Sequence, residues 1–328
     1  MANISSFTLS QLTDTVMRTF QDKQKKLPQV MKNSGFVQVN TLPMHTGDSK
    51  IFAERIDTTQ YAGVRDEGED AAEGVVQYGY EKTATVYTIA QTRSITKIMR
   101  DAGKDPQIID KITSLTEICP NTIDLDLAAR LTFAWSTTYT YDGATRTITV
   151  GDGLALISAV HTLTGSATTY SNQITANPAF SQGALETAEK SFVEEAYDNL
   201  GIKTYYTPTT IVTTDDPNTI NEVRRLLNAT ANVDSSNAGT VNVYANKYKH
   251  VISGRIATTA TGARDTAKSK YWFLVCADAS DFYFYSLVEP YVKAPNDGNN
   301  GEEFASENWT YLAAATYLIA IVSGKWIR

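Results

Sequence analysis

The chain has 328 residues, of which 42% are hydrophobic and 20% charged, and its formal net charge is −7. This composition indicates a folded globular protein, long enough for one large domain or two, and excludes a disordered or fibrous chain. The acidic balance argues against a protein whose main task is to bind nucleic acid, although it leaves room for a locally basic face.

Targeting and membrane signals are not evident in the sequence. The N-terminus lacks the charged and apolar regions of a signal peptide. The longest apolar run, 311–322, is too short to span a membrane and indicates a buried strand or helix. Cys119 and Cys276 lie in apolar runs, which favours two buried free thiols in a reducing cytosol over a disulfide.

The first predicted element is an amphipathic helix that a capping box of Thr8 and Gln11 opens. Its apolar stripe consists of Leu9, Leu12, Val16, Phe20 and Leu27. Pro28 ends the helix near Lys26. Lys23, Lys25 and Lys26 complement the dipole of its last turn, with contact to nucleic acid as the alternative. An extended segment, 34–44, follows.

Two strand-like runs, 50–56 and 82–93, then flank an acidic, glycine-containing segment at 61–74. In the first run Ile51, Ala53 and Arg55 share one face, and Phe52, Glu54 and Ile56 share the other, so both faces are partly apolar. Because an isolated two-stranded hairpin is marginal in water, this one must pack on its own domain or on a neighbouring subunit. The second interpretation makes it an assembly arm.

The charged residues at the tip of this hairpin are the candidate contact with another subunit. They are Arg65, Asp66, Glu67, Glu69, Asp70 and Glu73. A calcium loop is the alternative, but the alternating DxDxDG order of ligands is missing. The sequence therefore favours a charged surface that faces solvent or a partner.

A long helical tract occupies roughly 106–136. Asp105 is the predicted N-cap, followed by Pro106. Helical apolar spacing continues through Ile108, Ile109, Ile112, Leu115 and Cys119, and then through Leu125, Leu127, Ala128, Leu131 and Trp135. Pro120 interrupts the tract, and Asn121 could cap a second segment, so we expect one kinked helix or two consecutive helices. Asp142-Gly143 between alternating runs then predicts a β-hairpin.

The second half of the chain mixes helices and strands. Ser181 caps a helix that ends at Gly201, and Asp216-Pro217 starts another, with Ile220, Val223 and Leu227 on its inner face. Strands are predicted at 209–214, 240–245, 250–256, 271–276 and 281–288. The polar loop 294–303 should be exposed. The apolar stretch 309–327 should bury the C-terminus.

Motifs for catalysis, cofactors and metals are missing from this sequence. It has no P-loop, dinucleotide fingerprint, nucleophile elbow or zinc-protease motif, and its three histidines, His45, His161 and His250, are not in metal-ligand spacing. A pairing of Cys119 with His161 is conceivable, but Cys119 lies in an apolar helical stripe, which favours a structural thiol. No catalytic, cofactor-binding or metal-binding residue is therefore predicted.

Two further groups of charged residues have a functional and a structural interpretation. Asp215-Asp216 at the end of strand 209–214 resembles an active-site position of a parallel α/β fold. Capping of the next helix by Asp216 is the stronger interpretation. A scattered basic group could form a nucleic-acid patch, but it is weak evidence on an acidic chain: Arg224, Arg225, Lys247, Lys249 and Arg255.

The order of these elements resembles the major capsid proteins of tailed bacterial viruses with the Hong Kong 97-type fold, an α+β class. The likeness covers nearly the whole chain, and two segments add local similarity: DGLALISAVHTLTGS…YSN (152–172) and ALETAEKSF (184–192). Those segments are similar to the region where many such proteins enter their axial domain. The family has no catalytic signature.

The resemblance implies a division of the chain into five parts. They are an N-terminal arm (1–45), an extended β-hairpin loop (46–95), a peripheral domain with a long spine helix (96–150), an axial domain (151–290) and a return to the peripheral domain (291–328). The resemblance also implies hexamers and pentamers in an icosahedral shell, where several modest interfaces add through multivalency.

Two properties of some family members do not carry over directly. A cleaved scaffolding segment is not visible before the first helix, which favours a separate scaffolding protein. Lys50 and Lys82 lie in the hairpin, but nothing in the sequence shows an acceptor for the covalent cross-link that some members form, so none is predicted.

The sequence thus predicts a non-enzymatic, self-assembling shell protein that encloses double-stranded DNA through non-specific contacts. It would be made and assembled in the host cytoplasm and located in the virion, with scaffolding, portal or decoration proteins as further partners and without a membrane. The alternatives are an encapsulin-like nanocompartment shell, an α/β hydrolase-like enzyme using Asp215 or Asp216 with His161, and a tail or adhesin component suggested by the Thr- and Tyr-rich strands.

Overall fold

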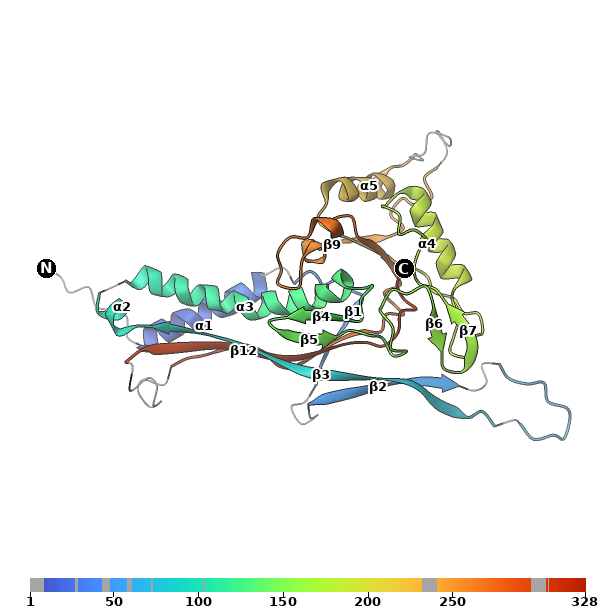
Figure 1. Cartoon of the computed structure of the whole chain (residues 1–328), viewed down its shortest axis with the longest axis horizontal. Helices are drawn as coiled ribbons and strands as arrows, with labels where there is room; N and C mark the ends of the chain where they lie inside the picture. The colour runs from blue at the N-terminus through green and yellow to red at the C-terminus, as the bar shows by residue number, and fades with distance from the viewer. Residues whose placement is uncertain are drawn as a thin grey trace.

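The computed structural model describes residues 9–26, 29–42, 48–57, 61–71, 73–102, 104–231, 241–295, 305 and 307–328. The molecule is elongated (Figure 1). A long arm of strands with two helices alongside leads into a lobe that carries α4 and α5, and a two-stranded hairpin projects beyond that lobe.

A five-stranded sheet runs through the arm, in the order β1-β11-β12-β3-β2. Its strands are β1 (Val37–Thr41), β2 (Ser49–Asp57), β3 (Val76–Ile95), β11 (Phe282–Lys293) and β12 (Trp309–Ile321). β1 pairs in parallel with β11, and the other pairs are antiparallel. The predicted hairpin is confirmed, but β3 begins at Val76 rather than at Lys82 because it pairs with the whole of β2.

Two helices pack beside this sheet. α1 (Leu9–Lys26) buries Leu12, Val16 and Phe20, as its apolar stripe predicts. α3 (Asp105–Thr132) is one continuous helix that contains Pro120. Thr8, Leu27 and Pro28, which were expected to delimit the first helix, lie outside the described residues. A short helix, α2 (Lys97–Asp101), connects β3 to α3.

The predicted caps of α3 are wrong. Its N-cap is Lys104, so Asp105 already belongs to the helix. Asn121 does not start a second helix, because its Oδ1 accepts a hydrogen bond from Nη2 of Arg255 at 2.8 Å. Trp135 was expected on the buried stripe, but α3 ends at Thr132 and Trp135 stands partly exposed in the turn beyond.

A buried cluster of polar side chains joins α3 to the sheet. Asp126 of α3 is 4% exposed and accepts hydrogen bonds from Arg146 Nη1 at 2.7 Å, Tyr317 Oη at 3.0 Å and Tyr139 Oη. Arg130 lies 3.8 Å from the same carboxylate. Since a buried carboxylate is costly without partners, these donors stabilise the contact between α3, β12 and the β4–β5 hairpin. We call them the Asp126 cluster.

The Asp142-Gly143 hairpin is confirmed. β4 (Thr138–Tyr141) pairs with β5 (Ala144–Thr147), and Asp142 and Gly143 have φ values of 49° and 75°. Two left-handed residues in succession match the right-handed twist of a two-residue hairpin.

The lobe contains a second sheet in the order β10-β8-β9 and two helices. Its elements are β8 (Thr210–Thr213), β9 (Lys249–Ile252), β10 (Trp272–Val275), α4 (Gln182–Glu194) and α5 (Pro217–Asn228). β8 is buried along its whole length. A small hairpin of β6 (His161–Leu163) and β7 (Ser166–Tyr170) lies beside the lobe.

Three predictions for the lobe need correction. Ser181 is the N-cap of α4, as expected, but the helix ends at Glu194 and not at Gly201. Gly201 belongs to a later turn, in which its amide donates to the carbonyl of Asp198. The predicted strand 240–245 is a turn in its described part, because the Asn242 side chain bonds to the carbonyls of Leu226 and Ala229 at the end of α5. The predicted strand 250–256 gives way to a 3₁₀ turn, η2 (Gly254–Ala257), whose carbonyls accept from Thr132 of α3.

The end of the chain is buried, as its apolar sequence predicts. Trp326, Ile327 and Arg328 are almost inaccessible, and Ile327 forms a β-bridge with Val275. Cys119 and Cys276 are free and buried, which confirms the thiol prediction. Most of the loop 294–303 lies outside the described residues.

Candidate functional site

The hairpin of β2 and β3 has one covered face and one open face. Phe52, Glu54 and Ile56 turn toward the protein, whereas Ile51, Ala53 and Arg55 are exposed. Ile51 is 59% exposed and Tyr78, which pairs with Arg55, is 75% exposed. Large apolar side chains this accessible on one hairpin are typical of a surface that another molecule covers.

Aromatic contacts fix the inner half of the hairpin to the chain's own sheet. Phe52 stacks on Tyr283 of β11, with ring centroids 5.3 Å apart, and Lys50 lies 4.0 Å from the centre of the Tyr285 ring. Beneath them Ala84 packs with Leu318 and Ala320. The inner half of the hairpin therefore packs on its own domain. This is one of the two arrangements left open by the sequence, the other being packing on a neighbouring subunit.

Polar contacts hold the hairpin where it leaves the sheet. Lys325 lies 3.6 Å from Glu54 and donates to Asn199, whose Nδ2 donates to the carbonyl of Arg55 at 3.3 Å. Tyr80 is hydrogen-bonded to Thr162 of β6 at 2.7 Å between the hydroxyls. Burial lowers the pKa of Lys325 despite the nearby carboxylates. These contacts fix the direction in which the outer half projects.

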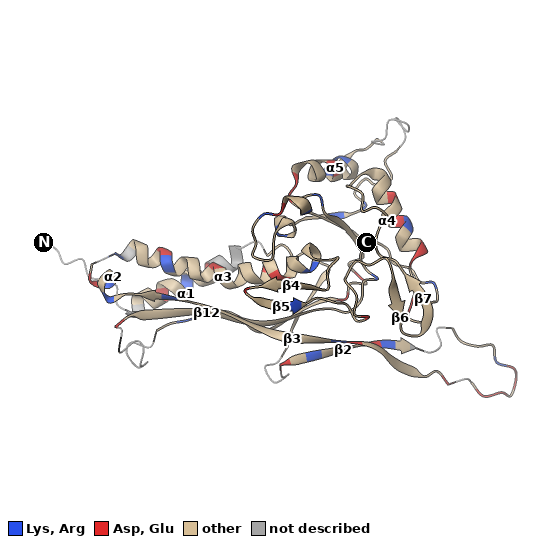
Figure 2. Ribbon diagram, viewed as in Figure 1, with Lys and Arg blue, Asp and Glu red and all other residues tan. Residues whose placement is uncertain are grey.

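Within the described residues, the charged tip makes no such contacts. All six predicted contact residues, from Arg65 to Glu73, are exposed, and Val64 beside them is completely exposed. Within the described part of the chain, their side chains make no hydrogen bond or ion pair with the protein. Figure 2 shows the tip extending away from the lobe. The structure thus brings these residues together on one accessible loop, and their contact with a partner stays a prediction.

The two hairpin lysines are both held by their own chain. Lys50 stacks on Tyr285, as described above, and Lys82 Nζ donates to Thr149 Oγ1 at 2.9 Å. Burial, together with the charge of Arg130, lowers the pKa of Lys82 to about 8. Neither contact involves a carboxyl or amide group of the kind that a cross-link needs.

The residues considered for catalysis are dispersed. Asp216 caps α5 by accepting from the Thr219 amide at 3.0 Å. His161 is buried, and its Nδ1 lies 2.7 Å from Asp152 rather than from either residue of the Asp215-Asp216 pair. Burial raises the pKa of the Cys119 thiol to about 11, which keeps it protonated at neutral pH. His45 lies outside the described residues.

Within the described ranges, no three His, Cys, Asp or Glu side chains form a group that could hold a metal ion. No helix of the described chain has the length and apolar character to cross a bilayer.

The predicted basic patch does not form a free surface. Lys249 donates to the carbonyl of Ser34 at 2.7 Å, Arg255 pairs with Asp124 at 2.7 Å, and Lys247 pairs with Glu189 at 2.9 Å. Arg225 bonds to Glu222 on the same helix. Since these four cations already have oxygen partners, they offer little to a phosphate backbone. Arg224, the fifth member of the predicted group, is exposed on α5.

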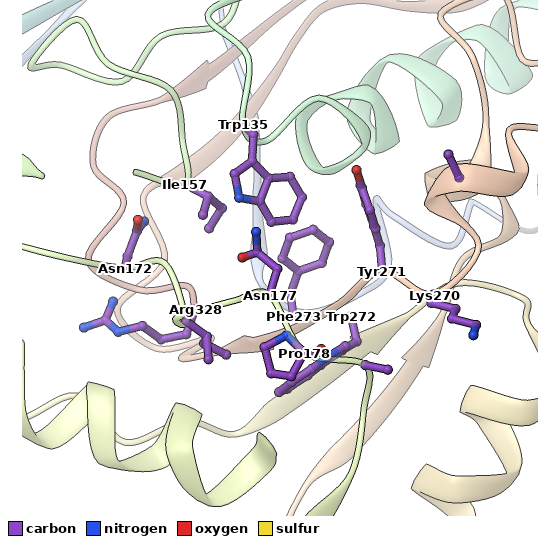
Figure 3. A pocket seen from close by; sticks show the side chains of 13 residues that line it. Trp135, Ile157, Asn172, Asn177, Pro178, Lys270, Tyr271, Trp272, Phe273 and Arg328 are labelled. Atoms are coloured by element: carbon purple, nitrogen blue, oxygen red, sulfur yellow. The ribbon is translucent and has the colours of Figure 1, made fainter. Parts of the chain in front are cut away.

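A pocket of about 410 Å³ opens between the end of α3 and the lobe (Figure 3). Trp135, Tyr271 and Phe273 form its aromatic side, and the Trp135 ring lies 5.0 Å from that of Tyr271, edge to face. Lys270 stands at the rim and Arg328 on the opposite side. Sequence reasoning missed this pocket because segments from five separate parts of the chain line it.

Two cationic side chains line the pocket, Lys270 and Arg328. None of the residues that line it is acidic. The Arg328 guanidinium donates to Ser191 Oγ at 2.9 Å and to main-chain carbonyls, so its bonding partners are neutral. Burial lowers the pKa of Arg328 to about 10, which still leaves it charged at neutral pH. Lys270 is exposed and makes no hydrogen bond or ion pair with the described residues.

Comparison with solved structures identifies the fold. A chain from Gordonia phage Cozz is similar over 91% of this chain and 84% of its own length, with a TM-score of 0.51 and 10% identity. A chain from the capsid of an empty GTA particle is similar over 91% of this chain and 88% of its own, with a TM-score of 0.50 and 12% identity. No family model and no curated protein matches the sequence. The chain therefore has a mixed helix-and-sheet fold found in phage capsids, as the order of its elements predicts.

Proposed function

We propose that this chain is the major capsid protein of a tailed bacteriophage, many copies of which assemble into a closed icosahedral shell around double-stranded DNA. The observation that carries the proposal is the hairpin. Its inner half is fixed to the chain's own sheet through one face and exposes Ile51 on the other, while its outer half exposes Tyr78 and the charged tip. A segment that is anchored at one end and uncovered at the other is suited to lie on a neighbouring subunit. The fold shared with the GTA capsid chain supports the same conclusion.

We assign to the parts of the molecule the roles that the family resemblance implies. The segment 1–45 is the N-terminal arm and 46–95 the extended loop. The region 96–150 forms the peripheral domain, with α3 as its spine helix, and 291–328 returns to it as β12. The region 151–290, which contains the lobe together with β6, β7 and most of β11, is the axial domain, whose loops meet around the five- and six-fold axes. In a closed shell such contacts are heterologous and repeat around rotation axes.

In this proposal the chain has a structural role as the building block of the shell, and it catalyses no reaction. Several modest interfaces per subunit add through multivalency, so no single contact needs to be strong. Scaffolding, portal or decoration proteins are further partners. DNA is enclosed by non-specific contact, and assembly takes place in the host cytoplasm before the chain becomes part of the virion.

Assembly of the purified chain tests the proposal. Light scattering and negative-stain microscopy should show closed particles of uniform size, from the chain alone or with its scaffolding partner. Monomers and small oligomers under every condition would rule the proposal out.

The contents of the particle test the second half of the proposal. Particles from phage-producing cells should hold double-stranded DNA that resists added nuclease until the shell is opened. Intact particles that enclose a protein cargo instead of DNA would identify a nanocompartment and exclude the capsid role.

A further inference from the structure

The pocket between α3 and the lobe combines features that fit an acidic segment with an apolar side chain. Its wall is aromatic, it has no acidic lining residue, and Lys270 and Arg328 supply positive charge. Its volume of about 410 Å³ lies within the range of about 300–1,000 Å³ that is usual for ligand pockets. The described chain leaves this space open to solvent.

The hairpin tip has the complementary chemistry. Val64 is the most exposed of the large hydrophobic side chains in the described chain. Directly after it come Arg65 and then the five carboxylates from Asp66 to Glu73. Another strongly exposed aliphatic residue, Ile98, lies in the basic segment between Lys97 and Arg100, which the positive pocket would repel.

The chain's own tip is not placed to use its own pocket. Figure 1 shows the hairpin projecting past β6 and β7, away from the end of α3. The contacts of Glu54, Asn199 and Lys325 at its base hold it in that direction. An occupant from this protein must therefore come from another copy.

We propose that the aromatic pocket of one subunit receives the hairpin tip of the next, with Val64 against Trp135, Tyr271 and Phe273 and the tip carboxylates beside Lys270. This inference rests on the proposed function and deepens it, because it names the surface that the extended loop reaches. Burial of the Val64 side chain contributes hydrophobic free energy to the contact, and this contribution does not depend on direction. The charges speed the encounter and select against basic segments.

Engineered disulfides test the position of the tip. The double variant Val64→Cys/Ala267→Cys places one thiol on the tip and one on the pocket wall. Mild oxidation of assembled particles should give a ladder of linked chains on a non-reducing gel, because a disulfide forms only when the two Cα atoms come within about 7 Å. The matched control is Val64→Cys/Ser114→Cys, whose second thiol sits at an exposed position of α3. Linking of the first pair should exceed that of the control about tenfold, as expected when the tip is held at the pocket.

Charge reversal provides an independent readout. Lys270→Glu should slow assembly, Lys270→Gln should slow it less, and adding Asp66→Lys to Lys270→Glu should restore the rate. Thermal unfolding of the unassembled subunit should differ little among them, since Lys270 makes no hydrogen bond or ion pair within the described chain and has only a minor attraction to Asp216.

The outcomes separate this inference from the proposed function. Particles that form normally while both thiol pairs stay unlinked, or link equally, overturn the tip-to-pocket contact and leave the capsid role intact. Failure of the unmodified chain to form particles overturns the capsid role and this inference with it. A ladder specific to Ala267, together with charge-swap rescue, supports both.

Discussion

The hairpin tip and the Asp126 cluster both concentrate charge, but their surroundings are opposite. At the tip, five carboxylates stand exposed and make no side-chain bond within the described chain. In the cluster, one carboxylate is buried and is satisfied by three hydrogen bonds and a second guanidinium. Charge at the tip is fully hydrated and contributes little to folding. Charge in the cluster is desolvated, so its partners are essential to the folded subunit.

This difference teaches which residues serve the subunit and which serve the assembly. If it is correct, changes at the tip should alter association and leave unfolding unchanged, and changes in the cluster should do the reverse.

The largest effect is expected from deleting residues 61–74. Assembly should be lost completely, because the deleted tip is the proposed contact with the next subunit. The subunit should still fold, because the tip has no contacts with the rest of its own chain in the described structure. Light scattering and microscopy measure assembly, and thermal unfolding reports on the subunit. Loss of cooperative unfolding in the deletion variant would show instead that the tip belongs to the subunit's core.

Asp126→Ala should destabilise the subunit by about 3–5 kcal/mol, because it leaves buried donors and two guanidinium groups without their carboxylate. Equilibrium urea unfolding of the unassembled subunit measures this. Asp70→Ala is the matched control at the tip and should change the free energy of unfolding by less than about 0.5 kcal/mol. Similar losses from both variants would erase the distinction between the two regions.

Neutralising the charges of the tip should slow assembly and leave the stability of the subunit unchanged. In the variant Asp66→Asn/Glu67→Gln/Glu69→Gln/Asp70→Asn, the assembly rate at low salt should fall about tenfold, since steering between opposite charges is lost. At about 1 M salt the two chains should assemble at similar rates, because screening removes the advantage of the native tip. Time-resolved light scattering at both salt concentrations decides this.

The last effect is the smallest at neutral pH, grows as the pH falls, and concerns the stability of the subunit and not its assembly. Burial, with a smaller contribution from Arg224, lowers the pKa of His250 from 6.5 to about 4. Between those values the unfolded chain binds a proton that the folded chain does not, so stability falls as the pH drops through this window. His250→Gln should lose less stability than the native chain between pH 6.5 and 4. Urea unfolding across this range measures the difference, and equal losses would contradict the assignment to His250.

Local sequence patterns predicted the elements whose stability is local. The alternation in 50–56 and the Asp142-Gly143 turn specify hairpins through neighbouring residues, and Asp216 caps α5 through a bond three residues away. Errors arose where a distant partner decides the structure. Asn121 looks like a cap in isolation but bonds to Arg255, and Asn242 turns a strand-like segment by bonding to the end of α5.

The candidate interface was only half predictable for the same reason. The charged tip is a continuous run of sequence, so composition alone located it. The aromatic pocket forms only because Trp135, Tyr271 and Arg328, which are far apart in the sequence, come together in the fold. A local sequence pattern cannot predict that. The covered face of the hairpin likewise depends on Tyr283 and Tyr285, which lie far along the chain.

The central sheet also imposes an order on synthesis. β1 and β3 come from the first third of the chain, yet they pair with β11 and β12 near its end, and the hydrogen-bonded residues Thr88 and Thr316 are 228 positions apart. At about 5–20 residues per second, the ribosome leaves β3 without its partner for roughly 10 to 50 s. During that time its strand edges are open to pairing with other nascent chains. Until β12 is made, nothing in the chain covers the edge of β3 that β12 will occupy.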